Sequence, residues 1–229
     1  MDQYAALNQL GRLFSDVINQ ELAQNLFDHQ VDRVDLQLVA QPSFGSKHEQ
    51  HRLNIREHIV HKNDKNLKHR DKVNILDLNQ IPKSFAYYFS VSHCSDMGGY
   101  IRSNYPIGFD IESTDRIENK TLERVSQYAE IQLVKNTSQI LSEKMQNALI
   151  WSAKEACFKA LHIADLDQHY LNDVKVISNI TLTEIKTLSY NETDLFMFKC
   201  QLSTDKALLK VNTGFATVIA NHIYTVFLI

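Results

Sequence analysis

Hydrophobic positions along the 229-residue chain recur at helical spacing in some segments and alternate in others. Residues 4–27 carry an apolar stripe close to i, i+3, i+4, i+7, which predicts an amphipathic helix packed on the body of the protein. The stripe consists of Leu7, Leu10, Phe14, Val17, Ile18 and Leu22. Acids outnumber bases on its polar face, which disfavours a helix lying on a membrane. Residues 31–39 then alternate as a strand, and residues 46–62 predict a second helix with a capping box of Ser46 and Glu49.

The middle and the end of the chain predict further strands around two helices. Apolar runs separated by turn residues predict a meander of strands at 85–93, 99–103 and 107–112. Helices are predicted at 117–135 and 138–161. Segments rich in β-branched and aromatic residues predict strands at 174–177, 180–188, 195–202 and 214–228. This order indicates an α+β protein with a helical extension over 1–30, a first α+β half over 31–115 and a second over 116–229.

The strand predicted at 107–112 carries two carboxylates. Apolar residues alternate with the others along this strand, so the apolar side chains face one side and Asp110 and Glu112 face the other. Two acids on one face repel each other unless a cation lies between them, and Mg²⁺ takes oxygen ligands. An edge strand with a solvated acidic face is the alternative at this point.

A helix free of Gly and Pro is predicted from Asn147 to Leu161. Trp151, Glu155 and Lys159 are spaced four apart and share one stripe of this helix, with Lys154 beside them. An ordinary Glu-to-Lys pair on a solvated face is the plain alternative. It leaves the tryptophan unexplained, because a large aromatic rarely lies on a stripe kept for solvent.

Together these segments resemble the two signature motifs of the 4'-phosphopantetheinyl transferase superfamily. The motifs are Gly108-Phe109-Asp110-Ile111-Glu112 and Trp151-Ser152-Ala153-Lys154-Glu155-Ala156 with Lys159. They stand in the family's order, and 45 residues separate Asp110 from Glu155. Ser92-His93 ends an apolar run where the Sfp-type branch of the family has a Ser-His pair. The resemblance extends from about residue 85 to 161, and His162-Ile163-Ala164-Asp165 replaces the glycines that usually follow the second motif.

The resemblance implies a fold of two pseudo-twofold-related halves with the active site in the cleft between them. It implies transfer of the 4'-phosphopantetheine arm of coenzyme A to a serine of an apo carrier protein, with Mg²⁺ as cofactor. The serine hydroxyl attacks the phosphorus next to the pantetheine arm, and adenosine 3',5'-bisphosphate leaves. Positioning and neutralisation of developing charge supply most of the rate in such transfers.

The resemblance also implies roles for single residues. The metal ligands it implies are Asp110, Glu112 and Glu155. The catalytic residues it implies are Asp110, Lys154 and Glu155. The contacts with phosphates of coenzyme A that it implies are Ser92, His93, Lys154 and Lys159. Glu155 is third ligand, general base, or both through a metal-bound water, and these alternatives stay open. For His93 the plain alternative is a strand-end histidine satisfied by the backbone.

Charge is distributed unevenly along the chain. The net charge is −3, whereas residues 47–72 hold eight Lys or Arg against four acids, a net charge of +4. A basic segment in an acidic protein suits a multiply phosphorylated ligand, so we expect Lys47, Arg52 and Arg56 to hold the 3'-phosphate of coenzyme A. A solvated basic helix and loop is the plain alternative. A transition-metal site from the five histidines of this segment is disfavoured, because no Cys or nearby acid completes a ligand set.

Composition narrows the class of protein. A content of 44% hydrophobic and 22% charged residues is typical of a soluble globular protein, and the negative net charge argues against general nucleic-acid affinity. Three cysteines without metal-like spacing favour a reducing cytoplasm. We see no apolar run long enough for a membrane span and no signal peptide. We expect a cytoplasmic monomer whose partners are coenzyme A and an apo acyl, peptidyl or aryl carrier protein.

Two alternatives to this function stay open. One is a dedicated fatty-acid holo-carrier synthase, which fits less well because those chains are shorter and trimeric. The other is a non-catalytic module on the same fold that binds coenzyme A or carrier proteins. The sequence does not indicate which carrier is modified.

The carrier is expected to dock on an apolar surface with a basic rim, because carrier proteins present an acidic helix beside the modified serine. Residues 117–149 are the candidate for this surface. They combine the basic residues Lys120, Arg124, Lys135 and Lys144 with the apolar residues Leu122, Val125 and Leu133. The plain alternative is that these apolar residues only pack their helix onto the core.

Overall fold

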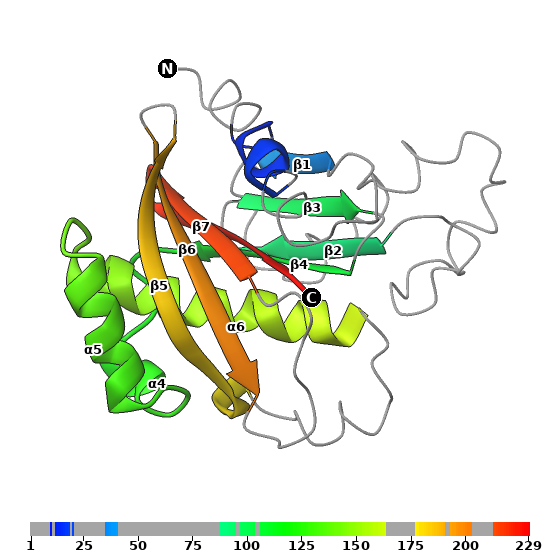
Figure 1. Cartoon of the computed structure of the whole chain (residues 1–229). Helices are drawn as coiled ribbons and strands as arrows, with labels where there is room; N and C mark the ends of the chain where they lie inside the picture. The colour runs from blue at the N-terminus through cyan, green and yellow to red at the C-terminus, as the bar shows by residue number, and fades with distance from the viewer. Residues whose placement is uncertain are drawn as a thin grey trace, which may run out of the picture.

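The described part of the protein, seen in a computed structural model, contains two antiparallel sheets and a set of helices (Figure 1). The structure describes residues 10, 12–18, 20, 35–40, 88–94, 97–103, 106–163, 177–190, 193–202 and 213–229. The smaller sheet has the strand order β1 (Asp35–Ala40), β3 (Met97–Ser103), β2 (Tyr88–His93). The larger sheet has the order β4 (Ile107–Ser113), β8 (His222–Leu228), β7 (Thr213–Ile219), β6 (Thr193–Leu202), β5 (Ile180–Tyr190). The α+β prediction is confirmed for these residues, whereas the pseudo-twofold relation between two halves stays a prediction.

The meander predicted from β2 through β4 is wrong in its last step. β2 and β3 pair with each other, but β4 forms its ladder with the C-terminal strand β8, where Asp110 stands opposite Thr225. β4 therefore forms one edge of the larger sheet. Sequence-adjacent strands usually pair, and nothing in the local pattern announces a partner so far along the chain.

The helices that follow β4 in the described residues are α4 (Asn119–Leu122), α5 (Tyr128–Thr137) and α6 (Glu143–Ile163). A short 3₁₀ helix, η2 (Ile177–Asn179), precedes β5 and overlaps the end of the strand predicted at 174–177. The single helix predicted at 117–135 is two helices, because Gln127 and Glu130 form a reciprocal capping box that begins α5. None of the helices in the described ranges has the length and apolarity needed to cross a membrane.

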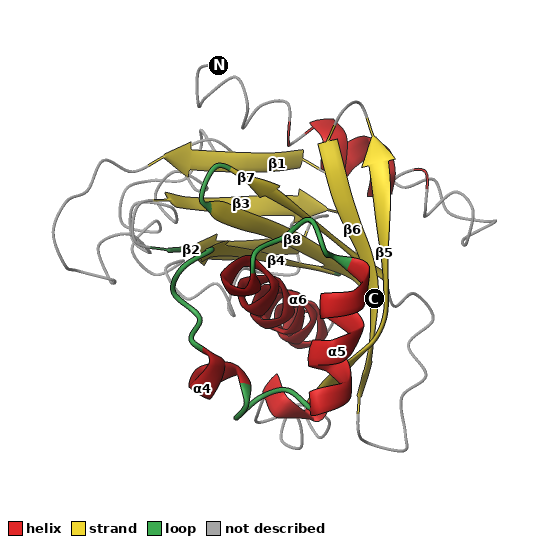
Figure 2. Cartoon of the chain, turned by 90° about the vertical axis from the view of Figure 1, so that its left-hand side faces the viewer, coloured by secondary structure: helices red, strands yellow, loops and turns green. Residues whose placement is uncertain are grey.

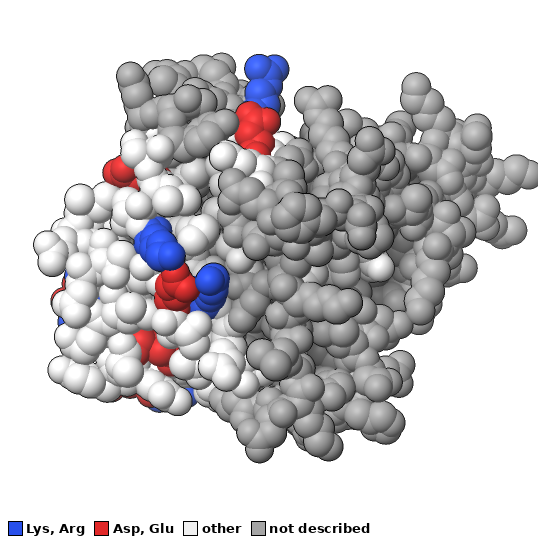
Figure 3. Space-filling view, in the orientation of Figure 1, with Lys and Arg blue, Asp and Glu red and all other residues white. Residues whose placement is uncertain are grey.

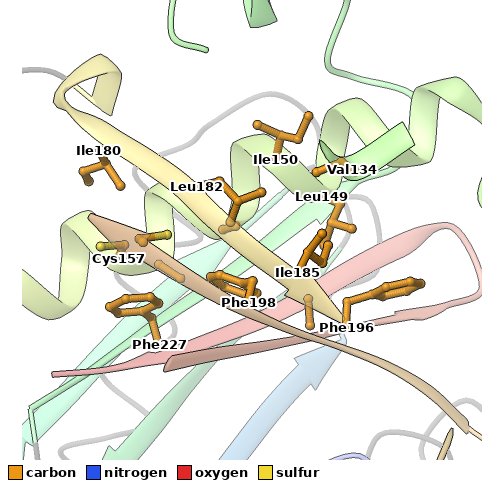
Figure 4. Close-up of a cluster of buried hydrophobic side chains, with 14 of the residues drawn as sticks. Val134, Leu149, Ile150, Cys157, Ile180, Leu182, Ile185, Phe196, Phe198 and Phe227 are labelled. Atoms are coloured by element: carbon orange, nitrogen blue, oxygen red, sulfur yellow. The ribbon is translucent and has the colours of Figure 1, made fainter. Parts of the chain in front are cut away.

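The larger sheet separates two hydrophobic cores. The α6-side core contains side chains of α6, β5, β6 and β8 that face one another in Figure 4. Its members include Leu149, Ile150, Cys157, Ile180, Leu182, Ile185, Phe196, Phe198 and Phe227. Figure 2 shows α5 and α6 packed beside the strands of this sheet. Neighbouring residues of β6 contribute to opposite cores, as strand alternation requires: Phe196 and Phe198 lie in this core, and Leu195 lies in the other.

The second core joins the N-terminal helix to both sheets, and we call it the N-terminal-side core. It includes Leu10, Phe14, Val17, Ile18, Met97, Ile101, Ile107, Phe109, Ile111 and Phe215. The prediction that the N-terminal segment packs on the body of the protein is therefore confirmed over its described part, residues 10–20 with gaps. Leu13 is buried there too, although the predicted stripe omitted it.

The strand predicted at 214–228 is a hairpin. β7 and β8 pair along their whole length, and residues 220 and 221 form the turn between them. Ala220 adopts φ = 53°, a left-handed conformation that usually calls for Gly or Asn. The turn escaped sequence reasoning because no residue of the usual turn type precedes Asn221.

Candidate active site

β4 presents its carboxylates to α6. Ile107, Phe109 and Ile111 are buried in the N-terminal-side core, so the alternate residues of the strand point to the opposite face, where α6 crosses. Asp110 and Glu112 are both buried. The alternation predicted for 107–112 is confirmed, and the solvated edge-strand alternative is excluded because both acids are covered.

Gly108 lets α6 approach β4 closely. A Cβ at this position would lie 1.8 Å from the carbonyl oxygen of Ala156 and 2.6 Å from the amide nitrogen of Ala160. Both contacts are to helix backbone, which no side-chain rotation relieves. The absence of a side chain at Gly108 therefore sets the distance between the strand that carries Asp110 and the helix that carries Glu155 and Lys159.

Gly108→Ala is expected to lower the free energy of unfolding by about 1–3 kcal/mol and to lower kcat/KM for transfer, because α6 has to move away from β4. Gly214→Ala is the matched control: its Cβ would meet the Phe198 ring at 2.2 Å, inside the same sheet, but no backbone of α6. Urea denaturation and transfer kinetics under conditions where both variants are folded separate the two effects. An equal loss of kcat/KM in both would contradict a special role for the contact between β4 and α6.

Asp110 is held by two donors through a single oxygen. Its Oδ1 accepts hydrogen bonds from Ser92 Oγ at 2.9 Å and from Lys159 Nζ at 2.7 Å. Its Oδ2 is buried and has no hydrogen-bond partner. Asp110 is 5% exposed, so water does not compensate this oxygen freely. An orphaned carboxylate oxygen at this depth fits a bound cation.

Glu112 is paired with Arg116, a residue that sequence reasoning missed. Arg116 Nε donates to Glu112 Oε1 at 2.7 Å, and its Nη2 donates to Oε2, while the amide of Ser113 also donates to Oε1. Glu112 is buried, whereas the Arg116 side chain is 59% exposed. The four-residue spacing from acid to base was the available signal, but these residues span a turn and not a helix.

Glu155 lies half-buried on α6, one turn before Lys159. Burial raises the pKa of Glu155 above its ordinary value. The positive charges of Lys159 and Arg116 lower this pKa, and the negative charges of Asp110 and Glu112 raise it further. The stripe predicted on this helix thus brings Glu155 and Lys159 into the electrostatic field of both strand carboxylates.

Glu155→Gln is expected to stabilise the metal-free protein at neutral pH. A raised pKa means that protonated Glu155 stabilises the fold at acid pH, and that this contribution is lost as the pH rises through the raised value. The amide variant avoids that loss, so its gain over wild type should vanish below the ordinary glutamate value of 4.5. Denaturant titrations across this range test the sign. A gain that does not depend on pH would contradict it.

The donors present fit Mg²⁺ in chemistry, although they are not preassembled as three ligands. Asp110 Oδ2 is free and Glu155 has a raised pKa, whereas both oxygens of Glu112 accept from Arg116. Within the described ranges no three His, Cys, Asp or Glu side chains converge closely enough to hold a metal. Asp110 Oδ2 could therefore take a cation without losing a hydrogen bond, whereas Glu112 would first have to release Arg116. Binding of Mg²⁺ by Asp110, Glu112 and Glu155 stays a prediction.

Lys154 lies away from these carboxylates. Its Nζ donates to the carbonyl of Val125 at 2.5 Å and to Glu130 Oε2 at 3.0 Å, and it is fully buried. Glu130 also accepts from the amides of Gln127 and Leu182. Consecutive helix positions are rotated by about 100°, so Lys154 faces this network while Glu155 faces β4. The resemblance implied that Lys154 contacts a phosphate, but in the structure its ammonium group is paired with Glu130.

The remaining residues implied by the resemblance are placed only in part. Ser92 contacts Asp110, and His93, which follows it at the end of β2, is half-buried. Lys47, Arg52 and Arg56 lie outside the described residues, as does the whole basic segment 47–72, so the proposed 3'-phosphate contacts stay predictions.

Comparison with known proteins bears on the region that contains this site. A search of curated proteins found no match to the chain. The family model described as the 4'-phosphopantetheinyl transferase superfamily matches residues 106–217. The matched region contains Asp110, Glu112, Glu155 and Lys159, and it runs from β4 through most of β7. Residues 106–217, just under half of the chain, are therefore similar to the 4'-phosphopantetheinyl transferase superfamily.

Proposed function

We propose that this protein transfers the 4'-phosphopantetheine arm of coenzyme A to a serine of an apo carrier protein, in the manner of the Sfp-type branch. The similarity of residues 106–217 to the superfamily supports phosphopantetheinyl transfer to carrier proteins in general. The observation that carries the proposal is the contact region between β4 and α6, which we call the joint. There Asp110 Oδ2 is buried without a hydrogen-bond partner, Lys159 donates to Asp110 Oδ1, and the charge of Asp110 acts on Glu155.

Each residue of this joint supports one part of the transfer. Mg²⁺, when bound, supplies positive charge to the diphosphate of coenzyme A and to the phosphoryl group in transit. Asp110 and Glu155 would hold the cation. Lys159 neutralises phosphate oxygens once they replace Asp110 as its partner. We also assign to Glu155 the role of general base for the attacking serine hydroxyl, a role that positioned carboxylates commonly serve.

The bond changes are those of a single phosphoryl transfer. The serine oxygen forms a bond to the phosphorus next to the pantetheine arm, and that phosphorus loses its bond to the bridging oxygen of the diphosphate. The bridging oxygen leaves with adenosine 3',5'-bisphosphate. We place this reaction in the cytoplasm with a monomeric enzyme, and the cytoplasmic location accords with Cys94, Cys157 and Cys200 being reduced.

Intact-mass spectrometry of an apo carrier protein tests the function. Incubation with coenzyme A, Mg²⁺ and this protein should add one phosphopantetheine group per carrier, and a chelator should abolish the addition. Peptide mapping should locate the group on the acceptor serine of the carrier protein. A protein that binds coenzyme A but modifies none of a set of acyl, peptidyl and aryl carriers would instead be a non-catalytic binding module.

The acceptor surface proposed over 117–149 needs one correction. Leu122 is 1% exposed and belongs to the α6-side core, and Val125 and Leu133 are half-buried against that core. The large apolar side chains exposed on this segment are Tyr128, at 77%, and Ile140, at 64%. Of the basic rim, Lys120, Arg124 and Lys144 are exposed, whereas Lys135 is half-buried and pairs with Glu143.

The face seen in Figure 3 is a poorer candidate for an acidic partner. Figure 3 shows basic and acidic side chains next to one another over the described part of this face. On strands β5 and β6, Lys186 and Lys199 both pair with Glu184. Paired charges offer an acidic helix less attraction than unpaired basic groups.

Arg124→Glu combined with Tyr128→Ala is therefore expected to raise the carrier's KM while leaving the KM of coenzyme A unchanged. The reason is that both side chains are exposed and that neither residue belongs to β4 or α6. Lys186→Glu is the matched control, since it removes a basic residue from the face that carries paired charges. A change in the donor KM, or none in either constant, would place the acceptor on another surface.

A further inference from the structure

β2 and β4 are joined by side chains in place of a strand ladder. Ser90 Oγ accepts a hydrogen bond from the amide of Phe109 at 2.9 Å, and Ser92 Oγ accepts one from the amide of Ile111 at 3.1 Å. Alternate residues of a strand face the same side, so Ser90 and Ser92 meet alternate amides of β4. These two hydroxyls, which we call the serine seam, connect the smaller sheet to the edge of the larger one.

The two serines of the seam differ in one respect. Ser90 Oγ accepts a hydrogen bond from the Phe109 amide. Besides the corresponding bond from the Ile111 amide, Ser92 Oγ donates to Asp110 Oδ1 at 2.9 Å and accepts from Lys159 Nζ at 3.0 Å. A serine hydroxyl has one donor and two acceptor sites. At Ser92 the donor goes to Asp110, and the acceptor sites take the Ile111 amide and Lys159. Its capacity is filled by these three protein groups.

We propose that Ser92 is a positioning residue for the metal ligand Asp110, a role that rests on the proposed function. The Ser92 hydroxyl and Lys159 both occupy Oδ1, so the free oxygen of the carboxylate is Oδ2, the buried atom without a partner. The same hydroxyl is bonded to the backbone of the next residue, Ile111. The Ser92 Oγ atom therefore sets both the orientation of the Asp110 carboxylate and the position of β4 beside it. Partners of this kind typically contribute 10–100-fold to metal affinity.

Mn²⁺ binding to the full chain tests the role, with Ser90→Ala as the matched control for Ser92→Ala. Each variant loses one bond to a β4 amide, but Ser92→Ala alone also loses the bond to Asp110. Trp151, the single tryptophan, lies one turn before Glu155 and reports binding by its fluorescence, and electron paramagnetic resonance of free Mn²⁺ gives an independent measurement. We expect Ser92→Ala to weaken Mn²⁺ affinity by about 10–100-fold and Ser90→Ala to leave it unchanged.

Three results would overturn the proposal, and they are distinguishable from one another. Equal weakening in both variants would reduce the seam to a structural connection. Unchanged Mn²⁺ affinity with weaker coenzyme A binding in Ser92→Ala would return Ser92 to a phosphate contact. In both cases the wild-type protein still binds metal and the proposed function stands. A wild-type protein that binds no Mn²⁺, with or without coenzyme A, would overturn the metal assignment itself.

A second pair of variants covers failure of Ser92→Ala to fold. Ser92→Cys and Ser90→Cys keep the size of the side chain but replace the hydroxyl with a weak donor and acceptor. Weaker Mn²⁺ binding in Ser92→Cys alone supports the positioning role, and equal binding in the two overturns it. Ser92→Thr, which retains the hydroxyl, should restore wild-type affinity.

Discussion

Asp110→Asn is expected to lower kcat/KM for phosphopantetheinyl transfer by more than about 100-fold while the protein stays folded. Loss of a residue that only orients a metal ligand costs 10–100-fold, so loss of a charged ligand should cost more. The fold should survive because the amide keeps an oxygen for Ser92 and Lys159, the two donors on Oδ1. Loss of the Asp110 charge removes the ion pair with Lys159, but it also relieves the repulsion between Asp110 and Glu155.

The measurement is transfer kinetics at increasing Mg²⁺, with circular dichroism as a check on folding. Asp194→Asn, an exposed acid on β6, is the control for loss of one negative charge and should leave transfer unchanged. Wild-type kcat/KM in Asp110→Asn at saturating Mg²⁺ would remove Asp110 from the metal site.

Lys154→Met is expected to lower the free energy of unfolding by about 3–5 kcal/mol. The variant leaves Glu130, which is 2% exposed, as a buried carboxylate without its cationic partner. Glu130 still accepts from the amides of Gln127 and Leu182, but those neutral donors do not replace an ammonium group. The segment before α5 should loosen as well, because Lys154 also binds the carbonyl of Val125.

A double-mutant cycle with Glu130→Gln isolates the pair. The double variant should lose less free energy of unfolding than the two single variants lose together, because neither partner is then left as an unpaired buried charge. Denaturant unfolding gives the four free energies. Unchanged stability of Lys154→Met together with a raised KM for coenzyme A would contradict the structural role and favour the phosphate contact that the resemblance implied.

The local chemistry of the site was predictable from the sequence because it follows from two periodicities. Strand alternation put Asp110 and Glu112 on the face away from the apolar residues, and helical spacing put Glu155 and Lys159 on one stripe. Both arrangements are present in the structure. For Lys154 the structure shows a buried pair with Glu130 and not the phosphate contact that the resemblance implied. Sequence adjacency to Glu155 does not indicate which face of the helix Lys154 occupies.

Long-range pairings were not predictable in the same way. The ladder between β4 and β8, and the pairing of Lys154 with Glu130, depend on how distant segments pack. Gly108 stands within the first motif, but its function as the contact point with α6 needs the position of the helix backbone. The Arg116 pairing with Glu112 spans a turn, where the spacing rules of helices do not apply.

The most direct test of the transferase function counts both products in one reaction. Apo carrier, coenzyme A and Mg²⁺ are incubated with the protein, and holo carrier is measured by mass while adenosine 3',5'-bisphosphate is measured by chromatography. Single phosphoryl transfer predicts equal amounts of the two products, and neither product when the carrier's acceptor serine is replaced by alanine. Holo carrier without the bisphosphate, or bisphosphate released without holo carrier, would contradict the account.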